Sequence, residues 1–143
     1  MLAREFYQRP TVDVARDLLG KLLVRRNREG TAAVRLVDVE AYLGPEDPAC
    51  HTFGSRRTPR VATMWGEAGH AYVYLIYGVH HCLNVVTVGG GAGEAVLVRG
   101  MRVEDIRTNA TLKDKVKLGS LASLTPGANV IAMGVMGSLA GYF

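Results

Sequence analysis

The first apolar pattern along the chain has the spacing of a helix. Within Val12–Leu19 the apolar side chains that recur on one face are Val14, Ala15 and Leu18. Thr11 precedes this segment and is a residue type that caps helix N-termini, while Gly20 follows it and is typical of helix ends. The pattern therefore predicts a helix over Val12–Leu19.

Farther along, the pattern changes to the alternation typical of strands. Turn residues at Asn27–Gly30 and Gly89–Gly93, and a break at Gly78, separate the runs. The predicted strands are Lys21–Arg26, Thr31–Tyr42, Ala71–Tyr77, His81–Val88 and Ala95–Arg99. Two later stretches, Arg102–Lys117 and Asn129–Met136, are compatible with short helices.

The order of these elements shows no strand–helix–strand alternation, which excludes a doubly wound fold. We expect an α+β fold, in which residues 1–143 form one domain with a curved, mainly antiparallel β-sheet flanked by short helices. The length of 143 residues and the apolar content of 48% suffice for one core. With 21% charged residues, the chain does not have the composition of a disordered protein.

The longest predicted strand, Thr31–Tyr42, combines apolar and acidic positions. Alternation puts Leu36, Asp38, Glu40 and Tyr42 on one face, and Val37, Val39 and Ala41 on the other. A lone acid on such a face is ordinarily solvated. A site here therefore needs support from the polar segment that follows, Leu43–Arg60, which is long for a connection in a compact domain. It carries His51, Arg56, Arg57 and Arg60.

Net charge and cysteine content narrow the function only slightly. The formal charge of +4 permits a polyanionic partner without requiring one. The two cysteines, Cys50 and Cys82, are too few for a disulfide scaffold and are expected to be reduced thiols. The N-terminus lacks the apolar run of a secretion signal, and glycines interrupt the apolar run at Val130–Phe143. We expect no membrane partner and a cytoplasmic location, associated with the nucleoid if the source is bacterial.

The sequence contains no motif for a metal site, a phosphate-binding loop or a serine nucleophile. His80, His81 and Cys82 are adjacent, and neighbours on a strand point to opposite faces, so they cannot jointly bind one ion. The glycines at Gly89–Gly91 lack the Gly-Lys-Ser/Thr continuation of a phosphate loop, and no Gly-x-Ser-x-Gly elbow occurs. We expect no metal and no cofactor.

The strand at Ala71–Tyr77 is rich in tyrosine. Tyr72 and Tyr74 share one face, and Tyr77 lies on the other face or at the strand end. Tyrosines alone are ordinary strand residues. Beside Glu40 and the arginine-rich loop they suggest another interpretation, because aromatic rings stack on nucleobases and arginines contact phosphates. A carboxylate near a stacked base is what hydrolysis of a base–sugar bond needs.

Several separate motifs occur together in one order. They are VEAYLGPED at 39–47, His51, RTPR at 57–60, YVYLIYG at 72–78, CLN at 82–84 and VLVR at 96–99, preceded by VARDLLGK at 14–21. Together they closely resemble the alkyladenine (3-methyladenine) DNA glycosylase family over the first two thirds of the chain. Agreement among several motifs is far more specific than any single one.

This resemblance implies an enzyme that flips a damaged purine out of duplex DNA and hydrolyses its N-glycosidic bond, leaving an abasic site, without a metal. Glu40 matches the family's catalytic carboxylate, which acts as a general base on water and stabilises the oxocarbenium-like sugar. Arg99 matches a strand arginine that helps to hold that water and Glu40. Its charge would favour the ionised form of Glu40.

The resemblance also assigns residues to the base pocket. Tyr42 is expected on one face of the flipped base, with His51 and Tyr74 on the other. Stacking of this kind favours electron-poor, cationic purines. Asn84 matches a residue that crowds the pocket and rejects the exocyclic amino group of guanine.

Contacts with the duplex follow from the same resemblance. Tyr77 matches the residue that wedges into the minor groove and fills the gap left by the flipped nucleotide. Arg57 and Arg60 are candidate phosphate contacts. The expected partner is double-stranded DNA that contains damaged purines, bound by a monomer.

The sequence departs from the family after Arg99. Residues 100–104 replace the usual small residue, acid and proline, and Ala128 stands where the family has lysine. Because family members continue through a further stretch, we expect a C-terminally shortened or divergent member of the family. Two hypotheses of function are therefore kept. The first is an active glycosylase, and the second is a non-catalytic or weakly active DNA-binding remnant of this family. An RNA-binding or structural protein is a third alternative. The presence of Glu40 and Arg99 favours catalysis.

Overall fold

The computed structural model describes residues 2–27, 30–78, 80–108 and 131–132. Two short helices, α1 (Arg4–Tyr7) and α2 (Thr11–Leu18), lead into β1 (Leu22–Asn27) and the long strand β2 (Gly30–Tyr42). Three 3₁₀ helices follow, η1 (Gly44–Glu46), η2 (Phe53–Ser55) and η3 (Pro59–Trp65). The remaining strands are β3 (Ala71–Ile76), β4 (His80–Thr87), β5 (Glu94–Thr108) and β6 (Ile131–Ala132).

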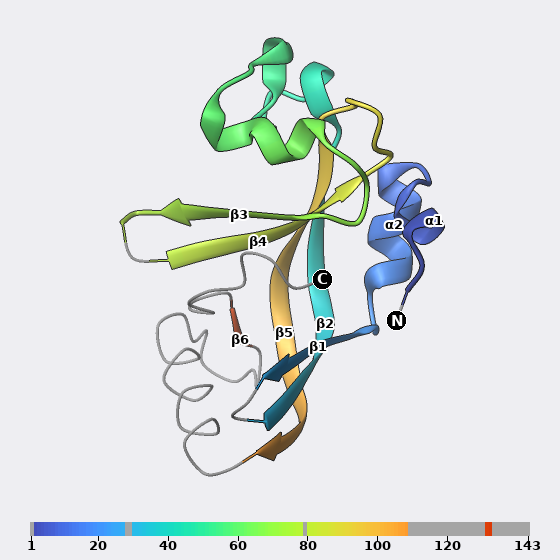
Figure 1. The fold of residues 1–143 in the computed structure, drawn as a ribbon, viewed down its shortest axis with the longest axis vertical. Helices are drawn as coiled ribbons and strands as arrows, with labels where there is room; N and C mark the ends of the chain where they lie inside the picture. Colours follow the sequence, from blue (N-terminus) through green and yellow to red (C-terminus); the bar gives the residue numbers. More distant parts are fainter. Residues whose placement is uncertain (1, 28–29, 79, 109–130, 133–143) are drawn as a thin grey trace.

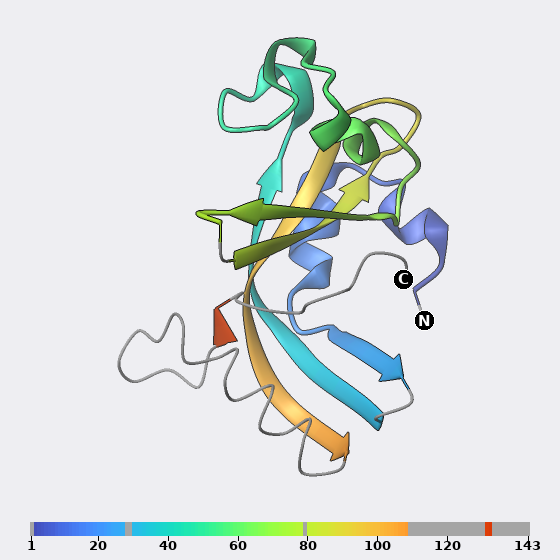
Figure 2. The same ribbon diagram turned by 60° about the vertical axis from the view of Figure 1, so that its left-hand side comes forward.

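The described strands form one antiparallel sheet, which confirms the predicted fold class. The strand order is β1-β2-β5-β4-β3, and β6 pairs with β5 beside this path. In Figure 1, β2 and β5 run along the length of the molecule, the β3–β4 hairpin projects to one side, and α1 and α2 lie on the other. Figure 2 shows the strong curvature of β2 and β5.

Two apolar clusters hold the domain together. The first packs α2 against the sheet and contains Val14, Ala15, Leu18, Val34, Leu36, Leu83, Val96, Val98 and Met101. The second lies under the 3₁₀ segments and contains Cys50, Val61, Met64, Tyr72, Val86 and Ala95. Val14 and Val96 are completely buried, and each such side chain contributes roughly 1.5–3 kcal/mol relative to an exposed one.

The predicted N-terminal helix exists but begins one residue early. Pro10 occupies the cap position, so the prediction of Thr11 as the cap is wrong. The Thr11 hydroxyl is instead 2.7 Å from the Thr87 hydroxyl and donates to Glu94 Oε2 at 2.5 Å. These contacts tie the start of α2 to the sheet.

Both predicted C-terminal helices conflict with the described residues. Residues 102–108 belong to β5, and Ile131–Ala132 forms β6, so helix is wrong at these positions. The rest of Arg102–Lys117 and Asn129–Met136 lies outside the described residues. Strand is favoured at 102–108 because β2 pairs with this segment along its length, and this distant partner overrides local helical preference.

A β-bulge at Val37 corrects the predicted strand face of Leu36. The partners Leu36–Met101 and Asp38–Gly100 leave Val37 as an extra residue on β2. This extra residue shifts the alternation by one, so Leu36 faces the first cluster rather than sharing the face of Asp38, Glu40 and Tyr42. Val39 and Ala41 pack against that cluster, as their alternation predicts.

Candidate active site

A pocket lies between the sheet and the 3₁₀ segments. Its lining residues come from β2, the following loop, η3, β3 and β4, and they are Tyr42, Ala49, His51, Met64, Tyr72, Tyr74 and Asn84. The empty volume is about 240 Å³, which includes space open to solvent. The aromatic and polar side chains that line it make it a candidate site for a small planar ring.

The loop between Tyr42 and His51 is held by local contacts. The Asp47 carboxylate accepts hydrogen bonds from the backbone N–H groups of Leu43 and Ala49, each at 3.0 Å. Gly44 has a φ of +78°, and a Cβ atom there would lie 2.8 Å from the carbonyl oxygen of Ala92, so only glycine fits. The segment predicted as a long polar loop is therefore a fixed wall of the pocket.

His51, Tyr72 and Tyr74 form an aromatic group inside the pocket. The Nδ1 atom of His51 is 2.8 Å from the Tyr72 hydroxyl, and the His51 and Tyr74 ring centroids are 4.6 Å apart. Burial raises the pKa of the Tyr72 hydroxyl. Burial also raises the pKa of the Tyr74 hydroxyl, with a further contribution from Cys82. Both tyrosines are therefore neutral and present polarisable ring faces.

Asn84 lies at the buried base of the pocket, with 2% of its surface exposed. Its Nδ2 atom donates a hydrogen bond to the carbonyl oxygen of Tyr72 at 3.1 Å, across the β3–β4 pair. This bond fixes the amide where a pocket ligand would meet it.

Glu40 and Arg99 form an ion pair beside the pocket. Arg99 Nη1 donates to Glu40 Oε2 at 3.2 Å, and Arg99 Nε lies 3.8 Å from Asp38 Oδ2. Burial, followed by the charge of Glu40 and a hydrogen bond to it, raises the pKa of the Tyr42 hydroxyl. Tyr42 therefore links the carboxylate to the aromatic pocket.

Tyr77 follows β3 at the tip of the β3–β4 hairpin, in agreement with the prediction of a strand-end position. Its surface is 86% exposed. Its φ is +52°, a left-handed conformation that costs a non-glycine residue about 1 kcal/mol or more. The hairpin thus holds a large aromatic side chain out in solvent.

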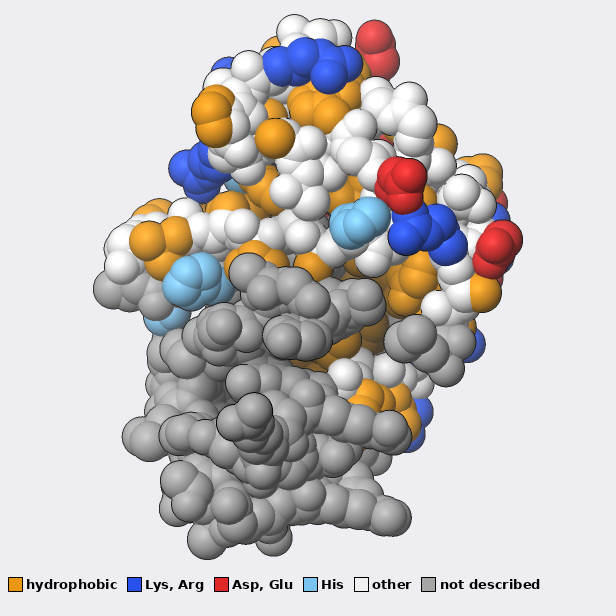
Figure 3. All heavy atoms as spheres, viewed as in Figure 1, with side chains coloured by type: hydrophobic (Ala, Val, Ile, Leu, Met, Phe, Trp, Pro, Cys, Tyr) orange, Lys and Arg blue, Asp and Glu red, His pale blue; other side chains and the backbone are white. Residues whose placement is uncertain are grey.

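The two predicted phosphate-binding arginines both lie on aromatic rings. The Arg57 guanidinium is 4.1 Å from the Trp65 ring centroid, and that of Arg60 is 5.4 Å from the ring of Tyr74. Arg60 Nη2 also donates to the carbonyl oxygen of Leu75 at 3.2 Å. Figure 3 shows basic side chains among apolar ones over this upper part of the molecule. Their phosphate contacts stay a prediction.

The structure therefore brings together most residues singled out from sequence. Tyr42, His51, Tyr74 and Asn84 line one pocket, with the Glu40–Arg99 pair joined to it through Tyr42. Three lining residues, namely Ala49, Met64 and Tyr72, received no place in the base pocket from the sequence. Tyr72 carried a usable signal, since it shares a strand face with Tyr74. Met64 lies in η3 and carried none.

Neither a metal-binding cluster nor a membrane-spanning helix occurs within the described ranges. There, no group of three or more His, Cys, Asp or Glu side chains could hold a metal ion, and both cysteines are free. Among the helices of those ranges, none has the length and apolar character needed to cross a membrane.

The protonation of His51 leads to a pH prediction. Burial, with smaller contributions from Arg60 and Arg56, lowers the pKa of His51 from its ordinary 6.5. As the pH falls, His51 therefore takes up a proton at higher pH in the unfolded chain than in the folded one. The stability that the buried, neutral His51 contributes is thus fully present above pH 6.5 and is lost as the pH falls through the pKa of His51 in the folded protein. Accordingly, the melting-temperature advantage of wild type over His51→Gln should shrink between pH 7.5 and pH 5.5.

Thermal melts at the two pH values test this expectation. His81→Gln, which removes an exposed histidine from β4, controls for loss of an imidazole elsewhere. An advantage of wild type over His51→Gln that stays constant or grows on acidification would contradict the prediction.

Comparison with known proteins agrees with this geometry. A family model described as methylpurine-DNA glycosylase matches residues 5–141. Proteins named "Putative 3-methyladenine DNA glycosylase" are 45% identical in Methanocella arvoryzae and 42% identical in Alkaliphilus oremlandii, each over 142 residues. These matches cover 99% and 94% of this chain and 70% of each relative. A Bdellovibrio bacteriovorus protein of the same name is 47% identical over 114 residues, 80% of this chain and 59% of the relative. The similarity thus continues well past Arg99, after which the sequence was expected to depart from the family.

Proposed function

The chain belongs to the methylpurine-DNA glycosylase family, and from this premise we propose that it excises damaged purines from double-stranded DNA by hydrolysing their bond to the sugar. Such excision begins base excision repair. The observation that carries the proposal is the aromatic pocket joined through Tyr42 to the Glu40–Arg99 pair. It supports catalysis over binding alone, because a binding site has no need of a carboxylate held in this way.

Glu40 is the proposed general base. It takes a proton from water as the water oxygen attacks C1′ of the sugar, and the electron pair of the C1′–N9 bond leaves with the purine. The transition state carries positive charge on the sugar, which the nearby carboxylate stabilises. Arg99 holds Glu40 through Nη1 and fixes its orientation. An alkylated, cationic purine needs no proton to leave, since it departs as a neutral base.

The pocket is proposed to recognise the flipped base by stacking. Tyr42 covers one face, and His51 and Tyr74 cover the other. A lowered pKa keeps His51 neutral near pH 7, so it does not repel a cationic purine. Asn84, held by the carbonyl of Tyr72, opposes the exocyclic amino group of guanine.

The protein is proposed to act as a monomer on duplex DNA. Tyr77 would enter the minor groove and replace the flipped base in the stack, while Arg57 and Arg60 contact phosphates on either side. The positive net charge of +4 suits this partner.

A base-release assay tests the proposed function. The protein is incubated with duplex oligonucleotides that contain 3-methyladenine or hypoxanthine, and the free base and the alkali-labile abasic site are measured. We expect base release, no strand cleavage without alkali, and DNA binding that weakens steeply with salt. Binding without release from either substrate would support the DNA-binding alternative, and neither binding nor release would overturn any role on DNA.

A further inference from the structure

Arg99 is shared by two carboxylates rather than one. Its Nη1 atom donates to Glu40 Oε2 at 3.2 Å, and its Nε atom lies 3.8 Å from Asp38 Oδ2. The two acids are two residues apart on β2 and therefore emerge on the same face. The guanidinium thus donates a hydrogen bond to Glu40 and lies within ion-pair distance of Asp38 at a different position on its edge.

Arg99 lies on β5 at a β-bulge that faces Asp38 and Val39 of β2. The partners Val39–Val98 and Asp38–Gly100 leave Arg99 as the extra residue on β5. Val98 before it faces the first apolar cluster, so Arg99 is turned to the opposite face, where Asp38 and Glu40 lie.

On the basis of the function proposed above, we propose that Asp38 is a positioning residue for base excision. Asp38 attracts the Nε edge of Arg99 by charge, which favours the orientation in which Nη1 is directed at Glu40. It also adds a second negative charge to the site, so that two carboxylates and one guanidinium carry a net charge of −1. A net negative site favours the positive charge that develops on the sugar.

The arrangement predicts that the charge of Asp38 matters for the rate and little for DNA binding. Asp38 and Arg99 are 56% and 55% exposed, so the effect is modest in size. We expect Asp38→Asn to lower the single-turnover rate at saturating protein about three- to tenfold, the range of one moderate electrostatic interaction. The lesion-DNA dissociation constant and the melting temperature should match those of the control, and Asp38→Glu should restore most of the rate.

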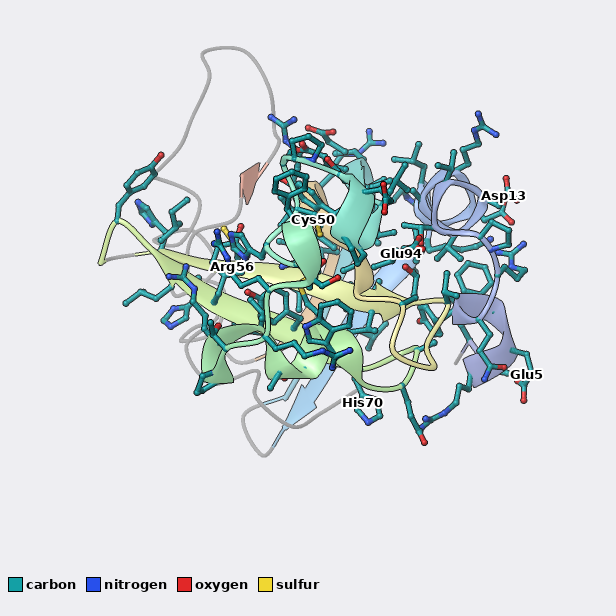
Figure 4. All side chains as sticks on the ribbon, turned by 90° about the horizontal axis from the view of Figure 1, so that it is seen from above. Glu5, Asp13, Cys50, Arg56, His70 and Glu94 are labelled. Atoms are coloured by element: carbon teal, nitrogen blue, oxygen red, sulfur yellow. The ribbon has the colours of Figure 1, made fainter. Side chains whose placement is uncertain are left out.

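Asp13→Asn is a closely matched control. Asp13 is 54% exposed and lies 3.7 Å from Arg16, so the change removes the same charge from a similar ion pair. It lies on α2, well away from Cys50 and Arg56 in Figure 4. We expect Asp13→Asn to keep the wild-type single-turnover rate.

A second measurement does not depend on turnover. In NMR spectra of the protein without DNA, the Arg99 Nε–H proton should exchange with water faster in Asp38→Asn than in Asp13→Asn. Equal rates of base release in the two variants would overturn the proposal, as would a loss of rate accompanied by weaker binding or a lower melting temperature. If wild type released no base, the proposed function would fail on its own, and unchanged Nε–H exchange would separately overturn the role of Asp38.

Discussion

Replacing Glu40 with glutamine is expected to reduce damaged-base release at least a thousandfold. Glutamine has nearly the same shape and can still contact Arg99 Nη1 through its amide oxygen, but it cannot accept a proton from water. General-base catalysis contributes roughly 10²–10⁴-fold, and a carboxylate that also stabilises the cationic sugar adds to that. Single-turnover release at saturating protein is the measurement, because it is insensitive to product dissociation.

Binding of lesion-containing duplex by Glu40→Gln should stay within severalfold of wild type, since the aromatic pocket is untouched. A suitable control is Glu67→Gln, because Glu67 is an exposed carboxylate that is also paired with an arginine, Arg4. It should release base at the wild-type rate. If Glu40→Gln retained more than a tenth of the wild-type rate, Glu40 would not be the general base.

The fold was predictable from sequence where local pattern and final pairing agree. The β3 and β4 strands and the α2 helix lie within a residue of their expected bounds, because alternation and turn residues act locally. The end of β5 was not predictable, since its partner in β2 is some seventy residues earlier. The face of Leu36 was wrong because the bulge at Val37 depends on pairing between the two strands and leaves no mark in either strand alone.

The candidate site was likewise predictable where local alternation decides a position and not where contacts between distant segments decide it. Glu40 and Tyr42 share a strand face and Tyr72 shares one with Tyr74, so alternation alone places them correctly. The juxtaposition of Arg99 with both Asp38 and Glu40 was not derivable from spacing, because it depends on the register in which β2 pairs with β5. Met64 enters the pocket from η3, whose position depends on packing under the loop rather than on a periodic pattern.

Replacing Tyr77 with alanine is the second change expected to have a large effect. Tyr77 is 86% exposed and has a left-handed backbone at the hairpin tip, so the protein maintains a strained conformation to present an unpacked ring. Stacking of an aromatic ring on a base contributes roughly 1–3 kcal/mol, which offsets part of the cost of extruding a nucleotide. Tyr77→Ala should therefore lower single-turnover release about ten- to a hundredfold, with the largest loss for lesions in stable base pairs.

The matched variant Tyr77→Phe keeps the ring and should retain most of the activity, because the proposed insertion of Tyr77 depends on stacking of its ring and not on its hydroxyl. The free energy of unfolding of both variants should lie within about 0.5 kcal/mol of that of wild type, the usual range for substitutions at exposed positions. Fluorescence of 2-aminopurine placed next to the lesion reports extrusion directly, and its increase on binding should be lost in Tyr77→Ala alone. If Tyr77→Ala and wild type released base at equal single-turnover rates, Tyr77 would not replace the extruded nucleotide in the stack. The strained backbone of this exposed tyrosine would then have another cause.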